Sequence, residues 1–164
     1  MSGIEYQIYE LLKKYRITLT TAESATGGMI ASTLINVPGI SEFFTEGYVT
    51  YSDAAKVKMI GVKKSIIDTY CVVSREVAEE MAIAAARTAE SVAALSVTGV
   101  AGPDGGTLEC PVGTVYIGSF LNAQTIVEHH IFEGNRMEIR KAATERALQL
   151  LVERITNEIS NYTE

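Results

Sequence analysis

The stretch from residue 17 to residue 28 constrains the fold of this chain more than any other part of the sequence. Residues 17–22 are a short run rich in apolar and β-branched side chains, which predicts a strand. Residues 23–28 are polar or small, and apolar residues at helical spacing follow them. A strand that breaks into a polar turn and reopens as a helix directs several backbone N–H groups and hydroxyls at one point. We interpret Ser24 as the centre of a reactive or anion-binding site; an ordinary helix start capped by Thr21 or Ser24 is the alternative.

Length and charge limit the kinds of partner that we expect. The chain of 164 residues suits one domain over residues 1–164 with a core of ordinary size. A net charge of −6 and a pI of about 5.0 argue against a nucleic-acid partner, because binding to a phosphate backbone needs clustered lysines and arginines. A small anionic ligand needs only one local positive site. No apolar run is long enough to span a membrane and the N-terminus lacks signal-peptide character, so we expect no membrane partner and a cytoplasmic location.

The cysteines and histidines do not predict a metal site. Cys71 and Cys110 lack metal-ligand spacing, and thiols in a cytosolic chain usually stay reduced. His129 and His130 are adjacent in a strand-like run, so their side chains should point to opposite faces of a sheet. We interpret both histidines as structural and expect no metal or other cofactor.

Periodicity and capping residues predict alternating helices and strands. Predicted helices cover residues 3–15, 25–35, 75–90 and 135–160, and another begins after Ser52 and ends at Gly61. Predicted strands cover residues 17–22, 44–51, 92–98, 113–120 and 124–132. Residues 65–68 are predicted to form one short turn, and a tight turn around Asn122 favours a hairpin. This order predicts an α/β layer fold with a mostly parallel sheet and one antiparallel hairpin strand.

Three polar segments each follow a predicted strand. They are residues 24–28, residues 51–56 and the loop over residues 98–107. If the three strands are parallel, all three segments lie at the same edge of the sheet. Ligand sites in open α/β sheets form at the carboxyl ends of strands. The sequence therefore predicts that the three segments build one site.

Ser24 is the candidate nucleophile of this site. A serine hydroxyl is a weak nucleophile until a base removes its proton. Both histidines lie in a late strand without an obvious route to Ser24, whereas Lys56 follows the second strand in the first turns of a helix. Burial and a helix N-terminus both lower the pKa of a lysine, which would let Lys56 act as the base. Tyr51 is predicted to hydrogen-bond Ser24 or Lys56 and relay a proton; a solvated lysine and a packed strand tyrosine are the alternatives.

Glycines and arginines supply candidate binding groups for the substrate. The loop over residues 98–107 has glycines that permit close backbone approach to an oxyanion or phosphate, although it matches neither the P-loop nor a dinucleotide fingerprint. A wide hairpin connection is the alternative. Arginine suits phosphate recognition, and a surface ion pair is its alternative role. The predicted substrate-binding residues are Thr26, Gly27, Gly28, Thr98, Gly99, Gly102, Asp104, Gly105, Gly106, Arg136 and Arg140.

The motifs of this chain resemble those of a known family. Residues 21–28 read TAESATGG, which is similar to the TAESCTGG signature of the CinA C-terminal domain family of nicotinamide-nucleotide amidohydrolases. Further strings agree in the correct order, and the likeness covers essentially the whole chain. They are residues 37–39, 47–52, 56, 61–62, 73–74, 98–106 and 111–115. The chain departs from the signature at Ala25, where the family often has cysteine; a thiol there is not required if the family chemistry holds.

The resemblance implies a fold, a reaction and a set of residues. The implied fold is a three-layer α/β/α sandwich with a mixed, mostly parallel sheet of about five strands. The implied reaction is hydrolysis of the carboxamide of nicotinamide mononucleotide to nicotinic acid mononucleotide and ammonia. It carries over Ser24 as nucleophile with Tyr51 and Lys56 as activating partners, and it favours a homodimer or larger assembly. Longer members carry an additional N-terminal domain, for which this chain is expected to be too short.

Two other functions stay open at this stage. One is a non-catalytic module in which the Ser24 turn and the glycine loop only hold a nucleotide. The other is an oxidoreductase that uses Tyr51 and Lys56 as an acid pair, although four residues intervene here where short-chain enzymes have three. Release of ammonia from nicotinamide mononucleotide separates the amidohydrolase from the binding module, and a dinucleotide titration tests the oxidoreductase.

Overall fold

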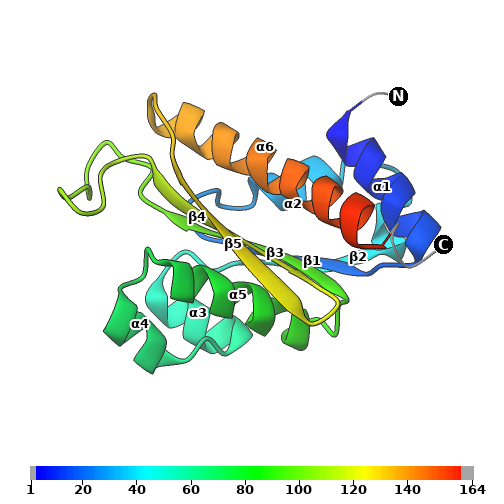
Figure 1. Ribbon diagram of the computed structural model, residues 1–164, viewed down its shortest axis with the longest axis horizontal. Coiled ribbons are helices and arrows are strands. Elements are labelled where there is room, and N and C mark those ends of the chain that lie inside the picture. The colour runs from blue at the N-terminus through cyan, green and yellow to red at the C-terminus, as the bar shows by residue number, and fades with distance from the viewer. Residues whose placement is uncertain (1–2, 160–164) are drawn as a thin grey trace.

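The computed structural model describes residues 3–159, and a five-stranded sheet forms their centre (Figure 1). The strands are β1 (Leu19–Glu23), β2 (Phe44–Val49), β3 (Ala93–Gly99), β4 (Thr114–Leu121) and β5 (Gln124–Ile131). They lie in the order β2-β1-β3-β4-β5 across the sheet. β1 pairs in parallel with β2 and β3, whereas β4 is antiparallel to β3 and β5. Of these five strands, β4 alone runs against the others, which confirms the predicted mostly parallel sheet.

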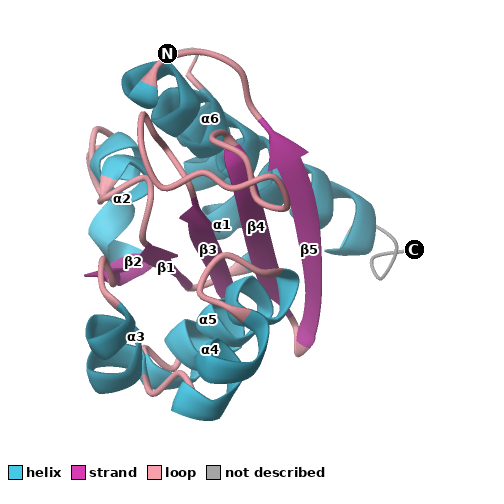
Figure 2. Ribbon diagram, turned by 90° about the vertical axis from the view of Figure 1, so that its left-hand side faces the viewer, coloured by secondary structure: helices cyan, strands magenta, loops and turns pink. Residues whose placement is uncertain are grey.

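Helices cover both faces of the sheet, so the three-layer α/β/α architecture is confirmed (Figures 1 and 2). One layer contains α1 (Ile4–Tyr15), α2 (Met29–Leu34) and α6 (Arg136–Arg154). The other contains α3 (Asp53–Ile60), α4 (Lys64–Tyr70) and α5 (Arg75–Thr88). A short 3₁₀ helix, η1 (Ile40–Glu42), precedes β2, and a π-helical turn, η2 (Ile155–Ile159), continues α6. Within residues 3–159, none of the helices combines the length and apolar character needed to cross a bilayer.

The helix starts follow from their capping residues. The Ser52 hydroxyl accepts a hydrogen bond from the backbone N–H of Ala55 at 3.1 Å and so begins α3, which ends at Gly61 in the left-handed conformation. Ser74 begins α5 in the same way. Asn135 begins α6 through a capping box with Glu138. The caps predicted at Ser52 and Gly61 are therefore confirmed, and the first of them fixes where Lys56 lies.

Two apolar clusters hold the layers together, one on each face of the sheet. The first joins α1, α2 and α6 to the sheet, and the second joins α3, α4 and α5 to it. Every residue of β1 is buried, and the sheet neighbours of β1 on both sides are parallel. On the second face, the backbone of α5 comes so close that a Cβ on Gly118 of β4 would lie 2.7 Å from the carbonyl oxygen of Ala78. This packing fixes the carboxyl end of β1, where the candidate site begins.

Some predicted boundaries were wrong for identifiable reasons. The helix predicted over residues 25–35 starts at Met29, because Gly27 and Gly28 have φ angles of 60° and 95° that a right-handed helix does not contain. The short turn predicted at residues 65–68 is the longer helix α4. The helix predicted over residues 135–160 ends its regular part at Arg154, and residue 160 lies outside the described residues.

Candidate active site

A cavity of about 250 Å³ opens at the carboxyl ends of β1, β2 and β3. Each of the three polar segments contributes to it, as does the N-terminal residue of α6. The lining residues are Ser24, Ala25, Tyr51, Asp53, Lys56, Val72, Val73, Thr98, Gly99, Ala101 and Arg136. The three segments thus meet at one edge of the sheet, as their positions after parallel strands predict.

Ser24 and Lys56 are in direct contact at the bottom of this cavity. The Nζ atom of Lys56 lies 3.2 Å from the Oγ atom of Ser24 and donates a hydrogen bond to it. The same amine donates to the carbonyl oxygen of Thr50 at 3.0 Å. Lys56 is completely buried, and Ser24 is 9% exposed. The sequence left a solvated helix lysine as the alternative for Lys56. Its burial in contact with Ser24 contradicts that alternative.

The surroundings of Lys56 favour its neutral form. Burial lowers the pKa of the Lys56 amine from its ordinary value of 10.5, because a charged ammonium loses hydration inside the protein. The carboxylate of Asp53 raises the same pKa in part. The net direction is downward, so more of the neutral amine is present near neutral pH than in a solvated lysine. A neutral amine has the lone pair that a general base needs.

Glu23 holds the turn that carries Ser24, a role that the sequence analysis did not assign. It is the last residue of β1 and is 1% exposed. Its carboxylate accepts hydrogen bonds from the backbone N–H groups of Gly28, Ile30 and Ala31 at 3.0, 3.0 and 2.9 Å. Glu23 therefore neutralises the start of α2 from inside the protein. Those N–H groups are not available to a substrate anion.

Arg140 holds the same turn from the opposite layer. Its Nε atom donates to the carbonyl oxygen of Ala25 at 3.0 Å, and its Nη2 atom donates to that of Thr26 at 2.9 Å. Two of its five N–H donors are thus used by the turn, and the predicted substrate-binding role of Arg140 stays a prediction. The packing is tight: a Cβ at Gly27 would lie 3.2 Å from Nη2 of Arg140.

The remaining amides of the turn differ in what they bind. The N–H of Gly27 donates to the carbonyl oxygen of Ser24, and that of Met29 donates to Thr26. Within the described residues 3–159, the backbone N–H groups of Ala25 and Thr26 have no hydrogen-bond partner. Ala25 follows Ser24 directly and lines the cavity. Its amide is thus the free donor next to the candidate nucleophile.

Tyr51 lines the cavity but does not contact the serine or the lysine through its hydroxyl. The Tyr51 hydroxyl accepts a hydrogen bond from Nη2 of Arg136 at 3.0 Å, and the side chain is 63% exposed. The predicted hydrogen bond to Ser24 or Lys56 was wrong, because the Lys56 amine bonds Ser24 and Thr50 while the exposed Tyr51 bonds Arg136. Arg136 also donates to the carbonyl oxygen of Gly102 at 2.7 Å, so it ties the glycine loop to the rim.

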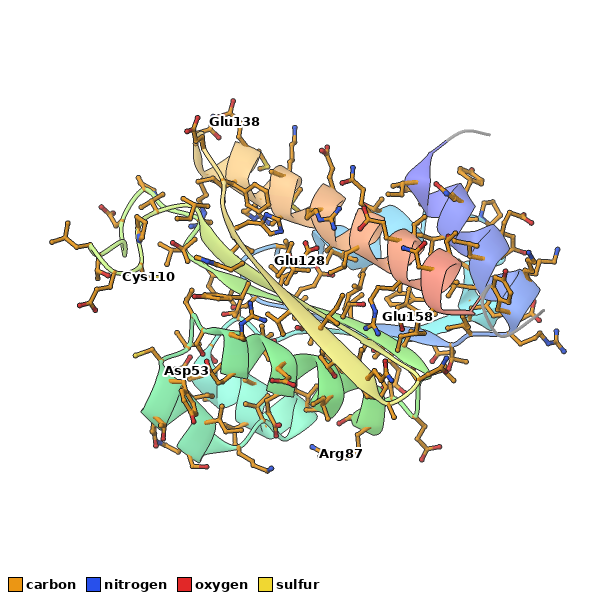
Figure 3. All side chains as sticks on the ribbon, viewed as in Figure 1. Asp53, Arg87, Cys110, Glu128, Glu138 and Glu158 are labelled. Atoms are coloured by element: carbon orange, nitrogen blue, oxygen red, sulfur yellow. The ribbon has the colours of Figure 1, made fainter. Side chains whose placement is uncertain are left out.

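Only the first part of the glycine loop reaches the site. Thr98 and Gly99 line the cavity, and the Thr98 hydroxyl donates to the carbonyl oxygen of Val72 at 2.8 Å. The outer part of the loop projects away from the sheet, and Figure 3 shows Cys110 on this projection. Asp104, Gly105 and Gly106 are exposed and line neither this cavity nor the one beside it, so the structure does not bring these three predicted residues to Ser24.

A second cavity of about 610 Å³ adjoins the first. The two share Ala101 and Arg136, which lie between them. Its walls are mostly apolar, and Arg140 borders it as well. Its remaining lining residues are Pro103, Val112, Gly134, Asn135 and Met137. A ligand larger than a single ring therefore has room to extend past Arg136.

The histidines lie away from this edge and have other contacts. Both are on β5, which is separated from β1 by β3 and β4. His129 stacks on Tyr116, and His130 stacks on Phe132, which fits the structural role predicted for them. Among residues 3–159, no three His, Cys, Asp or Glu side chains are grouped so that they could hold a metal ion. Cys71 and Cys110 are free thiols.

Two acidic residues of the site were missed as functional candidates. From the sequence, Glu23 belongs only to the motif over residues 21–28, and Asp53 only to the polar segment over residues 51–56. A carboxylate as the last residue of a strand, a few positions before a helix, is a signal for an internal helix cap. Asp53 and Lys56 are three positions apart on α3, which places both side chains on one face of the helix.

Comparisons with known proteins show what this chain is similar to. The chain matches the model of the family described as CinA C-terminal domain over residues 1–155. A relative from Clostridium beijerinckii named "Putative competence-damage inducible protein" is 49% identical over 149 residues, which are 91% of this chain and 36% of the relative. A relative of the same name from Clostridium perfringens is 50% identical over 137 residues, or 84% of this chain and 33% of the relative. The chain spans about a third of the length of the curated relatives it matches.

Solved structures have the same fold. The crystal structure of the competence damage-inducible protein A (ComA) from Klebsiella pneumoniae superposes with a TM-score of 0.91 at 30% identity, covering 94% of this chain and 96% of that chain. A CinA superfamily protein from Escherichia coli has a TM-score of 0.86 at 35% identity and covers 92% of this chain and 90% of its own.

Proposed function

Because the chain belongs to the CinA C-terminal domain family, we propose that it is a nicotinamide-nucleotide amidohydrolase. The proposed reaction converts nicotinamide mononucleotide and water to nicotinic acid mononucleotide and ammonia. The observation that carries the proposal is the contact between the buried Lys56 amine and the Ser24 hydroxyl, 3.2 Å apart at the bottom of a cavity. A serine beside a lysine of lowered pKa is an activated nucleophile.

In the proposed mechanism, neutral Lys56 takes the proton of Ser24 while Oγ attacks the carboxamide carbon. The tetrahedral oxyanion is stabilised by the free N–H of Ala25, which is the amide next to the nucleophile. One such donor is typically worth about 3 kcal/mol of activation free energy. The Lys56 ammonium then gives its proton to the leaving nitrogen, so ammonia departs and an acyl ester remains on Ser24. Water, deprotonated by Lys56, hydrolyses this ester and restores both side chains.

The other residues of the site have proposed parts in binding. Arg136 lies where the two cavities meet and keeps N–H donors beyond its bonds to Tyr51 and Gly102, so we assign it to the 5′-phosphate. Tyr51, held by Arg136 at the rim, is assigned to contact with the bound nucleotide. Arg140 is assigned to positioning the Ser24 turn, because its donors go to the carbonyl oxygens of that turn.

The experiment that tests the proposed function is an assay of ammonia release. We expect the protein to release ammonia from nicotinamide mononucleotide and to be much slower on nicotinamide and nicotinamide riboside, because these lack the phosphate that Arg136 would bind. A non-catalytic nucleotide-binding module would bind the mononucleotide and release no ammonia. Tight dinucleotide binding together with hydride transfer would instead favour the oxidoreductase.

A further inference from the structure

Asp53 is an exposed residue of the lining of the cavity that contains Ser24 and Lys56. It is the first residue of α3 (Figure 3). Its side chain is exposed, whereas that of Lys56 is buried. Because the two residues are three positions apart, both side chains lie on the face of α3 that lines the cavity. Within residues 3–159, the Asp53 carboxylate has no hydrogen bond or ion pair, and the Lys56 amine bonds Ser24 and Thr50 instead.

Asp53 is also the one acidic side chain among the residues that line this cavity. The other ionisable groups of the lining are Lys56, Arg136 and the Tyr51 phenol. A cationic ring that entered a cavity with only Lys56 and Arg136 would meet repulsion from any positive charge there. The Asp53 carboxylate adds a negative charge to the lining of this cavity, while Arg136 places a positive charge where the cavity meets the second one.

We propose that Asp53 is a specificity-determining residue that selects amides on a positively charged ring, such as a pyridinium, over neutral aromatic amides. This inference rests on the proposed function, because it concerns which carboxamides reach Ser24. The polarity of the cavity sets the orientation of a zwitterionic nucleotide: the cationic ring lies toward Asp53 and Ser24, and the anionic phosphate lies toward Arg136.

The size of the effect follows from the charges involved. Two unit charges several ångströms apart near a protein surface attract each other enough to change an affinity by about tenfold. Asp53 is exposed, so added salt weakens the attraction. The preference for the charged ring is therefore expected to fall as ionic strength rises.

The test measures binding rather than turnover, so that differences in the reactivity of the two amides do not matter. Calorimetry on Ser24→Ala protein compares nicotinamide mononucleotide with its neutral isostere, the 3-carbamoylphenyl C-nucleoside 5′-phosphate. We expect the pyridinium nucleotide to bind about tenfold more tightly than the neutral one. Adding Asp53→Asn should remove this difference by weakening binding of the charged ring alone, and Asp53→Glu should keep it.

Asp68→Asn is the matched control, because Asp68 is an exposed aspartate of α4 that pairs with Lys64 and does not line the cavity. It should leave the tenfold preference unchanged. An equal preference in the Asp53→Asn and parent proteins would overturn the assignment of Asp53 while leaving the proposed function intact. Failure of both nucleotides to bind would instead contradict the proposed function and, with it, this inference.

Discussion

Lys56 illustrates how far the surroundings of one residue decide its chemistry. In the sequence it is one of two lysines of the helix predicted after Ser52, and its burial is not visible there. In the structure it is completely buried, with its amine between Ser24 and Thr50. The sequence predicted the position of Lys56 after the second strand, because Ser52 caps the helix. It did not predict that Tyr51 bonds Arg136, which is 85 positions away in the chain.

Replacing Lys56 with methionine should remove activity without removing the fold. Methionine fills a similar volume in the core but has no base, and a positioned general base typically contributes 10²–10⁴-fold to a rate. We expect ammonia release from nicotinamide mononucleotide to fall by about 10³-fold, with a circular dichroism spectrum like that of the parent. Lys58→Met, on the exposed side of the same helix, should retain activity. Loss of activity in both variants, or in neither, would contradict the role of Lys56.

The pH dependence of activity should report the protonation of Lys56. Burial lowers its pKa from 10.5, and only the neutral amine accepts the proton of Ser24, so kcat/KM should rise with pH and level off above that lowered pKa. The Asp53 carboxylate raises this pKa in part. Asp53→Asn should therefore move the midpoint of the rise to lower pH, as measured by ammonia release across pH. A midpoint that moves upward in this variant would contradict the electrostatics described here.

At the scale of elements, the Ser24 turn is held between two layers of the protein. The Glu23 carboxylate accepts hydrogen bonds from the start of α2, and Arg140 of α6 donates to carbonyl oxygens of the turn. The strand and the helix around the turn could be predicted from local pattern. The Arg140 contact could not, because it joins residues 115 positions apart that meet only when α6 packs on α2.

Glu23→Gln should destabilise the protein through this turn. A glutamine side chain has one acceptor oxygen and an NH₂ group that faces backbone donors, so at least one of the N–H groups of Gly28, Ile30 and Ala31 would lose its partner. We expect the free energy of unfolding to fall by about 2 kcal/mol, measured by urea denaturation. Glu79→Gln, on the exposed side of α5, serves as the control and should have little effect. An unchanged free energy in Glu23→Gln would argue against the turn-holding role.

Another contact between elements fixes the edge strand β5 to α6. Arg146 of α6 donates to both carboxylate oxygens of Glu128 on β5 at 2.8 and 2.7 Å, and it also pairs with Glu153. The hydrogen bond from Arg146 is the main cause that lowers the pKa of Glu128 from 4.5 to about 2. Since the folded pKa is below the unfolded one, the stabilisation is complete above pH 4.5 and is lost as the pH falls toward 2.

Glu128→Gln tests this linkage. At pH 7 the variant should unfold with a free energy lower by about 2 kcal/mol. The difference from the parent should shrink below pH 4.5 and vanish near pH 2, because the parent loses its own carboxylate there. Urea denaturation over a pH series measures it, with Glu145→Gln on the exposed side of α6 as the control. A difference that stays constant with pH would show that the charge of Glu128 is not its source.

For the molecule as a whole, the convergence of three segments was the most informative prediction from the sequence. It depended only on the direction of β1, β2 and β3, which are parallel in the structure. The reach of the glycine loop was less predictable: its composition suits a phosphate cradle throughout, yet only its first residues line the cavity. The loop connects the antiparallel strands β3 and β4, and its outer part projects beyond the end of the sheet (Figure 1).

The central claim is that Ser24 is an acylated nucleophile, and one comparison tests it directly. Ammonia release from nicotinamide mononucleotide is measured for the parent, for Ser24→Ala and for Ser32→Ala, an exposed serine of the neighbouring helix α2. Calorimetry on the same three proteins shows whether each binds the nucleotide. The account predicts that all three bind, that Ser32→Ala releases ammonia like the parent, and that Ser24→Ala releases none above background. Full ammonia release by Ser24→Ala would contradict the account.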